Sequence, residues 1–213
     1  KGKSQGGINV SFPLKKKSGF TYGDYKHWPD DERWEIIDGV PYNMSPAPSR
    51  IHQKLSGNIF TAFSVYLKGK ICDVYHPPFD VRIPEEDEND DDIETIVQPD
   101  ITVVCDPNKL DDKGCKGAPD LIVEIISPSS GRKDLKEKFY RYERAGVKYY
   151  WLVYPEEQVV VIYTLNDEGT YGRPDAYAET DKITVALFRD LTIDLAEVFE
   201  IEQADSEEEN EEK

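Results

Sequence analysis

Cysteine and histidine are scarce in this sequence of 213 residues, which limits the cross-links and metal sites that it can form. The three cysteines, Cys72, Cys105 and Cys115, are odd in number and share no CxxC spacing. We therefore expect no disulfide framework and no zinc cage, and we expect a reducing, cytoplasmic location. The three histidines are scattered along the chain, so a bound metal would depend on oxygen ligands, as Mg²⁺ does.

Long apolar segments are also missing. No stretch is apolar over the length needed to cross a bilayer, and the first residues lack a signal-peptide pattern. We expect no membrane association, a flexible leader at 1–19 and a single domain at 20–200. The motifs GxxxxGKS/T and GxGxxG are absent, which argues against a nucleotide-binding α/β protein. Only "SPSSGRKD" (127–134) hints at that class, because it could cradle a phosphate at a helix start.

Positive charge is in short supply, and the net charge is −17. Residues 85–94 contain eight acids, and residues 197–213 contain nine acids and one lysine. Without these two stretches the chain carries a net charge of −1. We expect a solvated acidic loop insertion at 84–95 and an acidic, disordered tail at 201–213, either of which could bind a protein partner. The near-neutral remainder neither requires nor excludes a polyanionic substrate.

Apolar periodicity predicts an α/β domain. A β-hairpin is expected at 33–45 around Asp38-Gly39, and a helix at 49–69, where apolar residues recur at every fourth position. The other main elements are expected as strands at 71–84, 95–105 and 118–127, a helix at 129–146, and paired strands at 148–155 and 158–165. This αβββαβ order predicts a mixed sheet flanked by helices.

Glu124 is the unusual residue in the apolar segment "PDLIVEIISP" (119–128). A buried carboxylate needs a proton, hydrogen bonds or a cation. Asp120 shares its face of the strand but lies roughly 13 Å away, too far to share an ion. Asp100, on the neighbouring strand, could approach Glu124 closely enough for both to bind a divalent cation. Alternatively, Asp100 caps a strand and Glu124 pairs with a lysine or arginine, and spacing alone does not separate these interpretations.

The helix expected at 129–146 offers a cation to these acids. Its apolar stripe consists of Leu135, Phe139 and Tyr142. At about 100° per residue, Lys138 lies roughly 65° from the centre of this stripe, whereas Lys133 lies about 150° away. Lys138 is therefore the lysine best placed to present its ammonium group to the core, where Asp134 could pair with it at i, i+4. A solvated surface lysine is the alternative.

An aspartate, a glutamate on the next strand and a nearby lysine resemble the site of the PD-(D/E)XK nuclease superfamily. One branch, the Uma-type family of restriction-endonuclease-like proteins, is more similar still. Four motifs carry this resemblance in order: "RWEIIDGVPYNMSPAPSRIHQKLSGNIFTAF", "VQPDITVVCD", "GAPDLIVEIISPSS" and "KDLKEKFYRYERAGVKYYWLVYPEE". It runs from about Phe20 to Leu195 and implies a restriction-endonuclease-like fold with a phosphodiesterase site that depends on Mg²⁺ or Mn²⁺.

The resemblance also implies roles for single residues. Asp100 and Glu124 match the family's metal ligands, and the backbone carbonyl of Ile125 is the implied third ligand. The superfamily's lysine stands two residues after the glutamate, where this chain has Ile126. In this branch the matching lysine is Lys138, on the following helix.

Three further positions match the family. Glu35 corresponds to an acid of the N-terminal strand that would complete the site, and His52 and Gln98 could hold substrate or water. The sequence thus predicts a metal-dependent nuclease that hydrolyses phosphodiester bonds of nucleic acid, with DNA as the expected substrate and a homodimer as a natural way to cut two strands. The alternative is a catalytically inactive module of the same fold that binds nucleic acid or protein.

Overall fold

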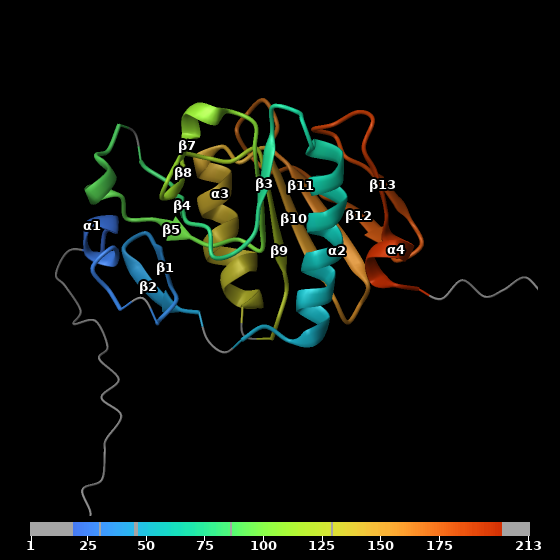
Figure 1. Cartoon of the computed structure of the whole chain (residues 1–213), viewed down its shortest axis with the longest axis horizontal. Helices are drawn as coiled ribbons and strands as arrows, with labels where there is room; N and C mark the ends of the chain where they lie inside the picture. Colours follow the sequence, from blue (N-terminus) through green and yellow to red (C-terminus); the bar gives the residue numbers. More distant parts are fainter. Residues whose placement is uncertain (1–18, 30, 45–46, 86, 129, 202–213) are drawn as a thin grey trace, which may run out of the picture.

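The computed structural model describes residues 19–201, except 30, 45–46, 86 and 129 (Figure 1). The expected leader at 1–19 and tail at 201–213 lie almost wholly outside these residues. The helical elements are α1 (Tyr22–Tyr25), α2 (Arg50–Leu67), η1 (Asp90–Asp92), η2 (Pro107–Lys109), η3 (Lys133–Lys138), α3 (Phe139–Ala145) and α4 (Leu195–Phe199). The strands are β1 (Trp34–Ile37), β2 (Val40–Asn43), β3 (Asp73–Tyr75), β4 (Val81–Arg82), β5 (Ile96–Val97), β6 (Ile101–Val104), β7 (Leu110–Asp111), β8 (Gly114–Lys116), β9 (Leu121–Ile125), β10 (Tyr149–Tyr154), β11 (Val159–Thr164), β12 (Asp175–Ala178), β13 (Lys182–Thr184) and β14 (Thr192–Asp194).

The central sheet has the strand order β12-β11-β10-β9-β6-β3. β9 and β10 run parallel and are connected through η3 and α3, whereas the neighbouring pairs β3–β6, β6–β9 and β10–β11 are antiparallel. Together with α2, these strands reproduce the expected αβββαβ order. The predicted mixed sheet flanked by helices is therefore confirmed. Among the described residues, no helix has both the length and the apolar character needed to span a membrane.

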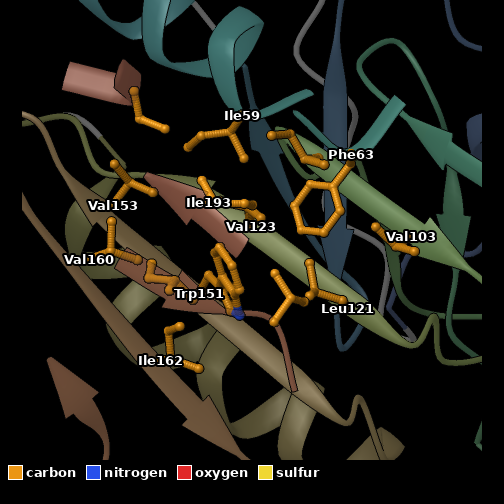
Figure 2. Packing of buried hydrophobic residues seen from close by; sticks show 14 of the residues in the cluster. Ile59, Phe63, Val103, Leu121, Val123, Trp151, Val153, Val160, Ile162 and Ile193 are labelled. Carbon is orange, nitrogen blue, oxygen red and sulfur yellow. The ribbon is translucent and has the colours of Figure 1, made fainter. Parts of the chain in front are cut away.

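Helices cover both faces of this sheet: α2 and α4 lie over one face and α3 lies over the other (Figure 1). The predicted four-residue repeat of α2 buries Leu55, Ile59, Phe63 and Leu67. Figure 2 shows Phe63 beside Trp151 of β10, with their ring centroids 5.8 Å apart. The Oγ of Ser49 accepts a hydrogen bond from the amide of His52 at 3.2 Å, which caps α2 and fixes where its first turn begins.

A second six-stranded sheet, with the order β2-β1-β5-β4-β8-β7, lies beside the central one. Its first two strands form the predicted hairpin, and Asp38 and Gly39 at the turn have φ values of 48° and 73°. Such left-handed conformations are those that a two-residue turn of this kind requires. The expected N-terminal hairpin is thus confirmed.

The single strand expected at 95–105 is instead two strands that belong to different sheets. β5 pairs with β1 and β4, β6 pairs with β3 and β9, and Gln98, Pro99 and Asp100 form the corner between them. The cause is Pro99, which has no N–H group and cannot continue a hydrogen-bonded ladder. This corner brings the two sheets together beside Asp100.

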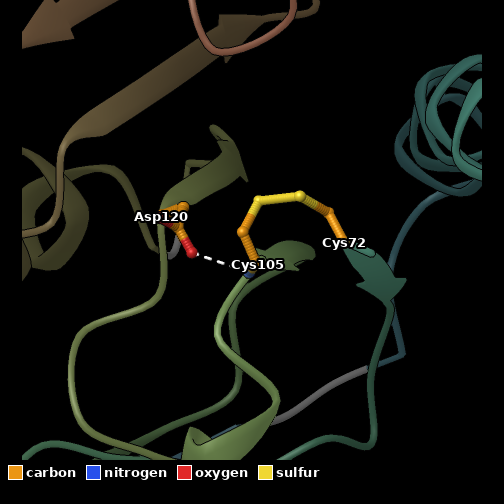
Figure 3. The surroundings of a disulfide bond; sticks show 3 residues. All are labelled: Cys72, Cys105 and Asp120. Carbon is orange, nitrogen blue, oxygen red and sulfur yellow. Dashed lines mark hydrogen bonds between the residues drawn. A yellow bond between two sulfur atoms is a disulfide. The ribbon is translucent and has the colours of Figure 1, made fainter. Parts of the chain in front are cut away.

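A disulfide joins Cys72 and Cys105, which corrects the expectation that the cysteines form no cross-link (Figure 3). Cys72 precedes β3 and Cys105 follows β6, and these strands pair with Asp73 opposite Val104. The two cysteines are therefore neighbours across the sheet although 33 residues separate them in sequence. Spacing along the chain does not reveal such a pair, and the low cysteine count no longer supports a reducing compartment.

Most of the described acids in the segment 84–95 are exposed, and a few of its side chains contact the rest of the domain. Asp90 lies 2.7 Å from the guanidinium of the fully buried Arg82, and Glu85 lies 2.7 Å from that of Arg141. Ile93 is completely buried in a cluster with Phe20, Tyr22, Ile36 and Ile96. Ion pairs and one apolar anchor therefore hold this segment against the second sheet and α3.

Candidate active site

A cleft of about 1050 Å³ lies at the corner between the two sheets and the start of α2. Six of the seven side-chain and backbone groups proposed from the sequence line it: His52, Gln98, Asp100, Glu124, Ile125 and Lys138. The seventh, Glu35 on β1, is completely buried and contacts the lining residue Lys138. The structure therefore brings all the predicted residues to one place.

Asp100 and Glu124 face each other across two antiparallel strands. Ile101 of β6 pairs with Val123 of β9, so the next position along this register sets Asp100 opposite Glu124. The Oδ2 atom of Asp100 accepts a hydrogen bond from the Ile125 amide at 2.7 Å and lies 3.2 Å from Nε2 of His52. No described residue donates a hydrogen bond to the other oxygen, Oδ1.

Glu124 is anchored in a similar way through one oxygen. Its Oε1 atom lies 2.7 Å from the ammonium nitrogen of Lys138 and accepts a hydrogen bond from the hydroxyl of Tyr142 at 3.0 Å. Among the described residues, none donates to Oε2. Each acid thus has one oxygen fixed by the protein and one that is free to bind a ligand in the cleft.

Glu35 holds the ammonium groups of two lysines behind these acids. Its Oε1 atom lies 2.7 Å from Nζ of Lys138 and accepts a hydrogen bond from the Gln98 amide at 3.0 Å. Its Oε2 atom binds Nζ of Lys133. Lys138 is also 3.6 Å from Asp134, the predicted i, i+4 pair. Lys138 is thereby fixed in place by three carboxylates, including that of Glu124.

The segment η3 is a π-helix, and this explains why Lys133 reaches the site. The α-helical periodicity predicted that Lys133 points about 150° away from the apolar stripe, and this prediction is wrong. A π-helix is hydrogen-bonded from i to i+5, so residues five apart stand nearly above one another. Lys133 and Lys138 are five apart, and both therefore reach Glu35.

The charges in this cluster do not balance. Glu35, Asp100, Glu124 and Asp134 face only two lysines, so the formal charges of these carboxylates and lysines leave an excess of two negative charges. Burial raises the pKa of Glu124 well above its usual value, and repulsion from Asp134, Asp100 and Glu35 adds to this although Lys138 opposes it. For Glu35, burial also raises the pKa, but the attraction of Lys138 and Lys133 outweighs burial and lowers it.

Lys138 and His52 respond to the same excess of negative charge. Burial lowers the pKa of Lys138, but Glu124, Glu35 and Asp134 outweigh burial and hold the pKa well above its usual value. Burial likewise lowers the pKa of His52, but the hydrogen bond to Asp100 and the negative charges of Asp100 and Asp134 together outweigh burial, so that the pKa is raised. Lys138 is therefore a permanent cation at neutral pH.

The oxygen donors of the cleft suit a hard divalent cation. Asp100 and Glu124 each offer a free carboxylate oxygen, and Ile125 lines the same cleft. The described residues contain no group of three or more His, Cys, Asp or Glu side chains placed to hold a metal together. Mg²⁺ commonly binds proteins through only one or two carboxylates and keeps several waters, so this ligand set fits Mg²⁺ better than a fully caged ion.

Three residues of the site were not predicted from the sequence. Lys133 was missed because an α-helical phase was assumed for η3. Tyr142 was assigned only to the apolar stripe, although a buried tyrosine needs a partner for its hydroxyl and could have been suspected for that reason. Arg33, which donates to the Oε1 atom of Gln98 at 2.7 Å and 3.1 Å, gave no signal in the sequence.

Comparisons with known proteins agree with this arrangement. A family model, Uma2, described as "Putative restriction endonuclease", matches residues 22–196. The chain belongs to the Uma2 family. This confirms the resemblance drawn from the four sequence motifs.

Relatives of this Uma2 protein are found in cyanobacteria. The uncharacterised protein slr1290 of Synechocystis is 27% identical over 151 residues, which cover 70% of this chain and 75% of slr1290. The crystal structure of a "putative nuclease belonging to DUF820" from Anabaena variabilis matches with a TM-score of 0.67 and 17% identity, over 85% of this chain and 98% of that one. The structural match confirms the nuclease-like fold, and the family supports a nuclease-like function.

Proposed function

We propose that this Uma2 protein is a metal-dependent nuclease that hydrolyses phosphodiester bonds of DNA and uses Mg²⁺ or Mn²⁺. The observation that carries the proposal is the pairing of Asp100 with Glu124 across two strands, each with one anchored and one free oxygen. The excess of two negative charges around them supports a divalent cation as the balancing partner. The family description, which names restriction endonucleases, favours DNA as the substrate.

The residues of the cleft have different roles in the proposed reaction. A divalent cation held by Asp100, Glu124 and the Ile125 carbonyl would polarise the scissile phosphate and lower the pKa of an attacking water. Lys138 is fixed by three carboxylates and stays protonated, so its ammonium group can stabilise negative charge that develops on the phosphate. Glu35 acts as a positioning residue, because it holds Lys138 and Lys133 without lining the cleft.

His52 has a supporting role in this proposal. Its Nε2 atom is 3.2 Å from Oδ2 of Asp100, which is the oxygen already bound by the Ile125 amide. The imidazole therefore keeps the Asp100 carboxylate in one orientation and leaves Oδ1 toward a ligand. Groups that orient metal ligands in this way typically contribute about 10- to 100-fold to metal affinity or activity.

The test is cleavage of a panel of DNA and RNA substrates by the full chain with Mg²⁺ or Mn²⁺ and with chelator. We expect DNA cleavage that requires the metal and that falls by more than about 100-fold in Asp100→Asn and in Glu124→Gln, since changes behind the ligands already cost up to that factor. Asp167→Asn, an exposed acid in the turn after β11, is the matched control and should cleave normally. Undiminished cleavage by either site variant would remove the assignment.

One contact also suits the alternative of an inactive nuclease-fold module. The ammonium of Lys138 already neutralises Glu124 at 2.7 Å without any metal, as a purely structural ion pair would. Titration with Mn²⁺ separates the two functions, because only the nuclease should bind the ion and lose binding in Glu124→Gln. The same preparation, measured by light scattering, tests the predicted homodimer.

A further inference from the structure

A second pocket of about 450 Å³ adjoins the catalytic cleft, and no role has been given to it so far. It is lined by residues of α1, of the segment before β4 and of the β7–β8 turn. Arg33 and Gln98 line both this pocket and the catalytic cleft, so the two hollows adjoin at these residues. A pocket of this size is large enough for a small organic ligand.

Aromatic side chains line much of this second pocket: Tyr22, Tyr25, Trp28 and Phe79. Phe79 stacks on Tyr75 with ring centroids 4.1 Å apart and an interplanar angle of 2°. Phe79 lines the pocket, and its stacking partner Tyr75 does not. A flat ring that enters the pocket could extend this existing stack, as nucleobases do on aromatic side chains.

Polar groups of the pocket are placed to form hydrogen bonds with such a ring. The Oδ1 atom of Asp80 accepts hydrogen bonds from Nε2 of Gln98 at 2.8 Å and from the hydroxyl of Tyr25 at 3.2 Å. No described residue donates to Oδ2, so this oxygen can accept a hydrogen bond from an amino group. A carboxylate accepts hydrogen bonds from the exocyclic amino group of cytosine in many complexes.

The charge of the pocket favours a base over a phosphate. Its lining contains four acids and three basic residues, namely Glu32, Asp80, Asp111, Asp112, Lys26, Arg33 and Lys113. A phosphate would be repelled by this balance, whereas a neutral base would not. Arg33 lines both hollows, where a guanidinium suits the phosphate that links two nucleotides.

We propose that this pocket binds one unpaired base, carrying an exocyclic amino group, of the DNA strand whose backbone lies in the catalytic cleft. The proposal rests on the proposed nuclease function and adds to it a specificity subsite, read by Asp80 and Phe79. Gln98 links the two hollows physically. Its backbone amide holds Glu35 of the catalytic cluster, and its side chain holds Asp80 and Arg33. The substrate class that follows is DNA with a single-stranded or extruded nucleotide beside the scissile phosphate.

The test uses the full chain, chelator to prevent cleavage, and single-stranded DNA oligonucleotides that each carry 2-aminopurine at one position. We expect the fluorescence to change on binding at one position relative to the bound segment. Phe79→Leu keeps an apolar side chain but removes the stacking surface, and it should weaken this binding by about 5- to 100-fold. Tyr140→Ala, an exposed tyrosine that lines neither pocket, is the matched control and should bind normally.

A second variant addresses base identity. Asp80→Asn should reduce the preference for bases with an amino group over thymine by about tenfold, whereas Asp167→Asn should not. Equal fluorescence changes in wild type and Phe79→Leu would overturn the pocket assignment, and so would an unaltered base preference in Asp80→Asn.

Parallel cleavage assays with Mg²⁺ keep the two proposals apart. If the wild-type protein cleaves DNA but shows no position-specific signal, the base pocket is refuted and the nuclease function stands. If the signal depends on Phe79 but no substrate is cleaved, the nuclease function is refuted and the pocket stands as a binding site. If the protein neither binds nor cleaves DNA, both proposals are overturned.

Discussion

Lys138 is a buried cation whose ammonium nitrogen lies 2.7 Å from both Glu35 and Glu124. Its side chain is only 2% exposed, and that of Glu124 only 5%. Burying these charges is costly, and the cost is offset only while each charge has its partners. Removal of one partner of this ion pair should therefore lower the stability of the fold.

Lys138→Met tests this at the residue scale. The substitution leaves Glu124 buried without its cation, and we expect it to lower the free energy of unfolding by about 3–5 kcal/mol. Urea denaturation at neutral pH measures the loss. Lys136→Met changes an exposed lysine two residues away and should alter stability by less than about 0.5 kcal/mol.

A second substitution tests whether the unpaired charge of Glu124 causes this loss of stability. Adding Glu124→Gln to Lys138→Met removes the unpaired charge, so the double variant should recover at least half of the lost stability. If the double variant loses as much free energy of unfolding as the two single variants together, the loss comes from altered packing and not from the unpaired Glu124 carboxylate.

At the scale of elements, η3 decides which lysines reach the site. An α-helix of the same sequence would point Lys133 away from the core, whereas the π-helical turn aligns it with Lys138. One residue removed from a π-helical turn restores the α-helical phase and changes a spacing of five into one of four. Residues four apart also share one face of an α-helix.

Deletion of single residues tests this geometry. Leu135 is 45% exposed within η3, and its deletion should leave both lysines on Glu35, with a loss of about 1–2 kcal/mol and retained metal-dependent cleavage. Tyr140 is 61% exposed within α3, and its deletion should rotate everything before it by about 100° and abolish cleavage. Circular dichroism and thermal unfolding check the fold of each variant. Equal damage from both deletions would contradict the assigned role of the π-helical turn.

The sequence predicted the elements whose signals are local. The apolar repeat of α2 and the turn at Asp38-Gly39 depend on neighbours in the chain, and both were found correctly. The break at Pro99 was visible but was interpreted as the entry to one strand, because periodicity alone does not show that β5 and β6 join different sheets. The π-helical phase of η3 had no local signal, and Lys133 was misplaced for that reason.

At the scale of the whole molecule, the disulfide and the site occupy opposite ends of β6. Asp100 precedes this strand and Cys105 follows it, and the Cys105 amide donates a hydrogen bond to Asp120 at 2.7 Å (Figure 3). The cross-link therefore stabilises the end of the sheet that is far from the cleft. Cys72 pairs with Cys105 because their strands are neighbours in the sheet. The spacing of cysteines along the sequence does not predict that strand order.

The joint substitution Cys72→Ser and Cys105→Ser should lower the free energy of unfolding by about 2–4 kcal/mol and leave cleavage unchanged. Reductant should lower the stability of the wild-type protein by a similar amount and should not affect the double variant. A wild-type protein that is indifferent to reductant would show that the cross-link does not form in solution.

Thiol labelling provides an independent count of the free cysteine thiols. Cys115 is completely buried, and burial raises its pKa to about 12, so it should not react with iodoacetamide at pH 8 in the folded protein. Mass spectrometry should find no label on the folded, unreduced chain and one label after unfolding. After unfolding and reduction it should find three. A labelled cysteine in the folded, unreduced protein would contradict either the disulfide or the burial of Cys115.

The cleft collects groups from widely separated parts of the chain. Glu35 comes from the first strand, Asp100 from the corner between the sheets, and Lys138 from the helix that follows β9. A nascent polypeptide on the ribosome consequently lacks the complete set of groups until more than a hundred residues beyond Glu35 have been synthesised. Unfinished chains released by abortive translation would then lack the proposed activity.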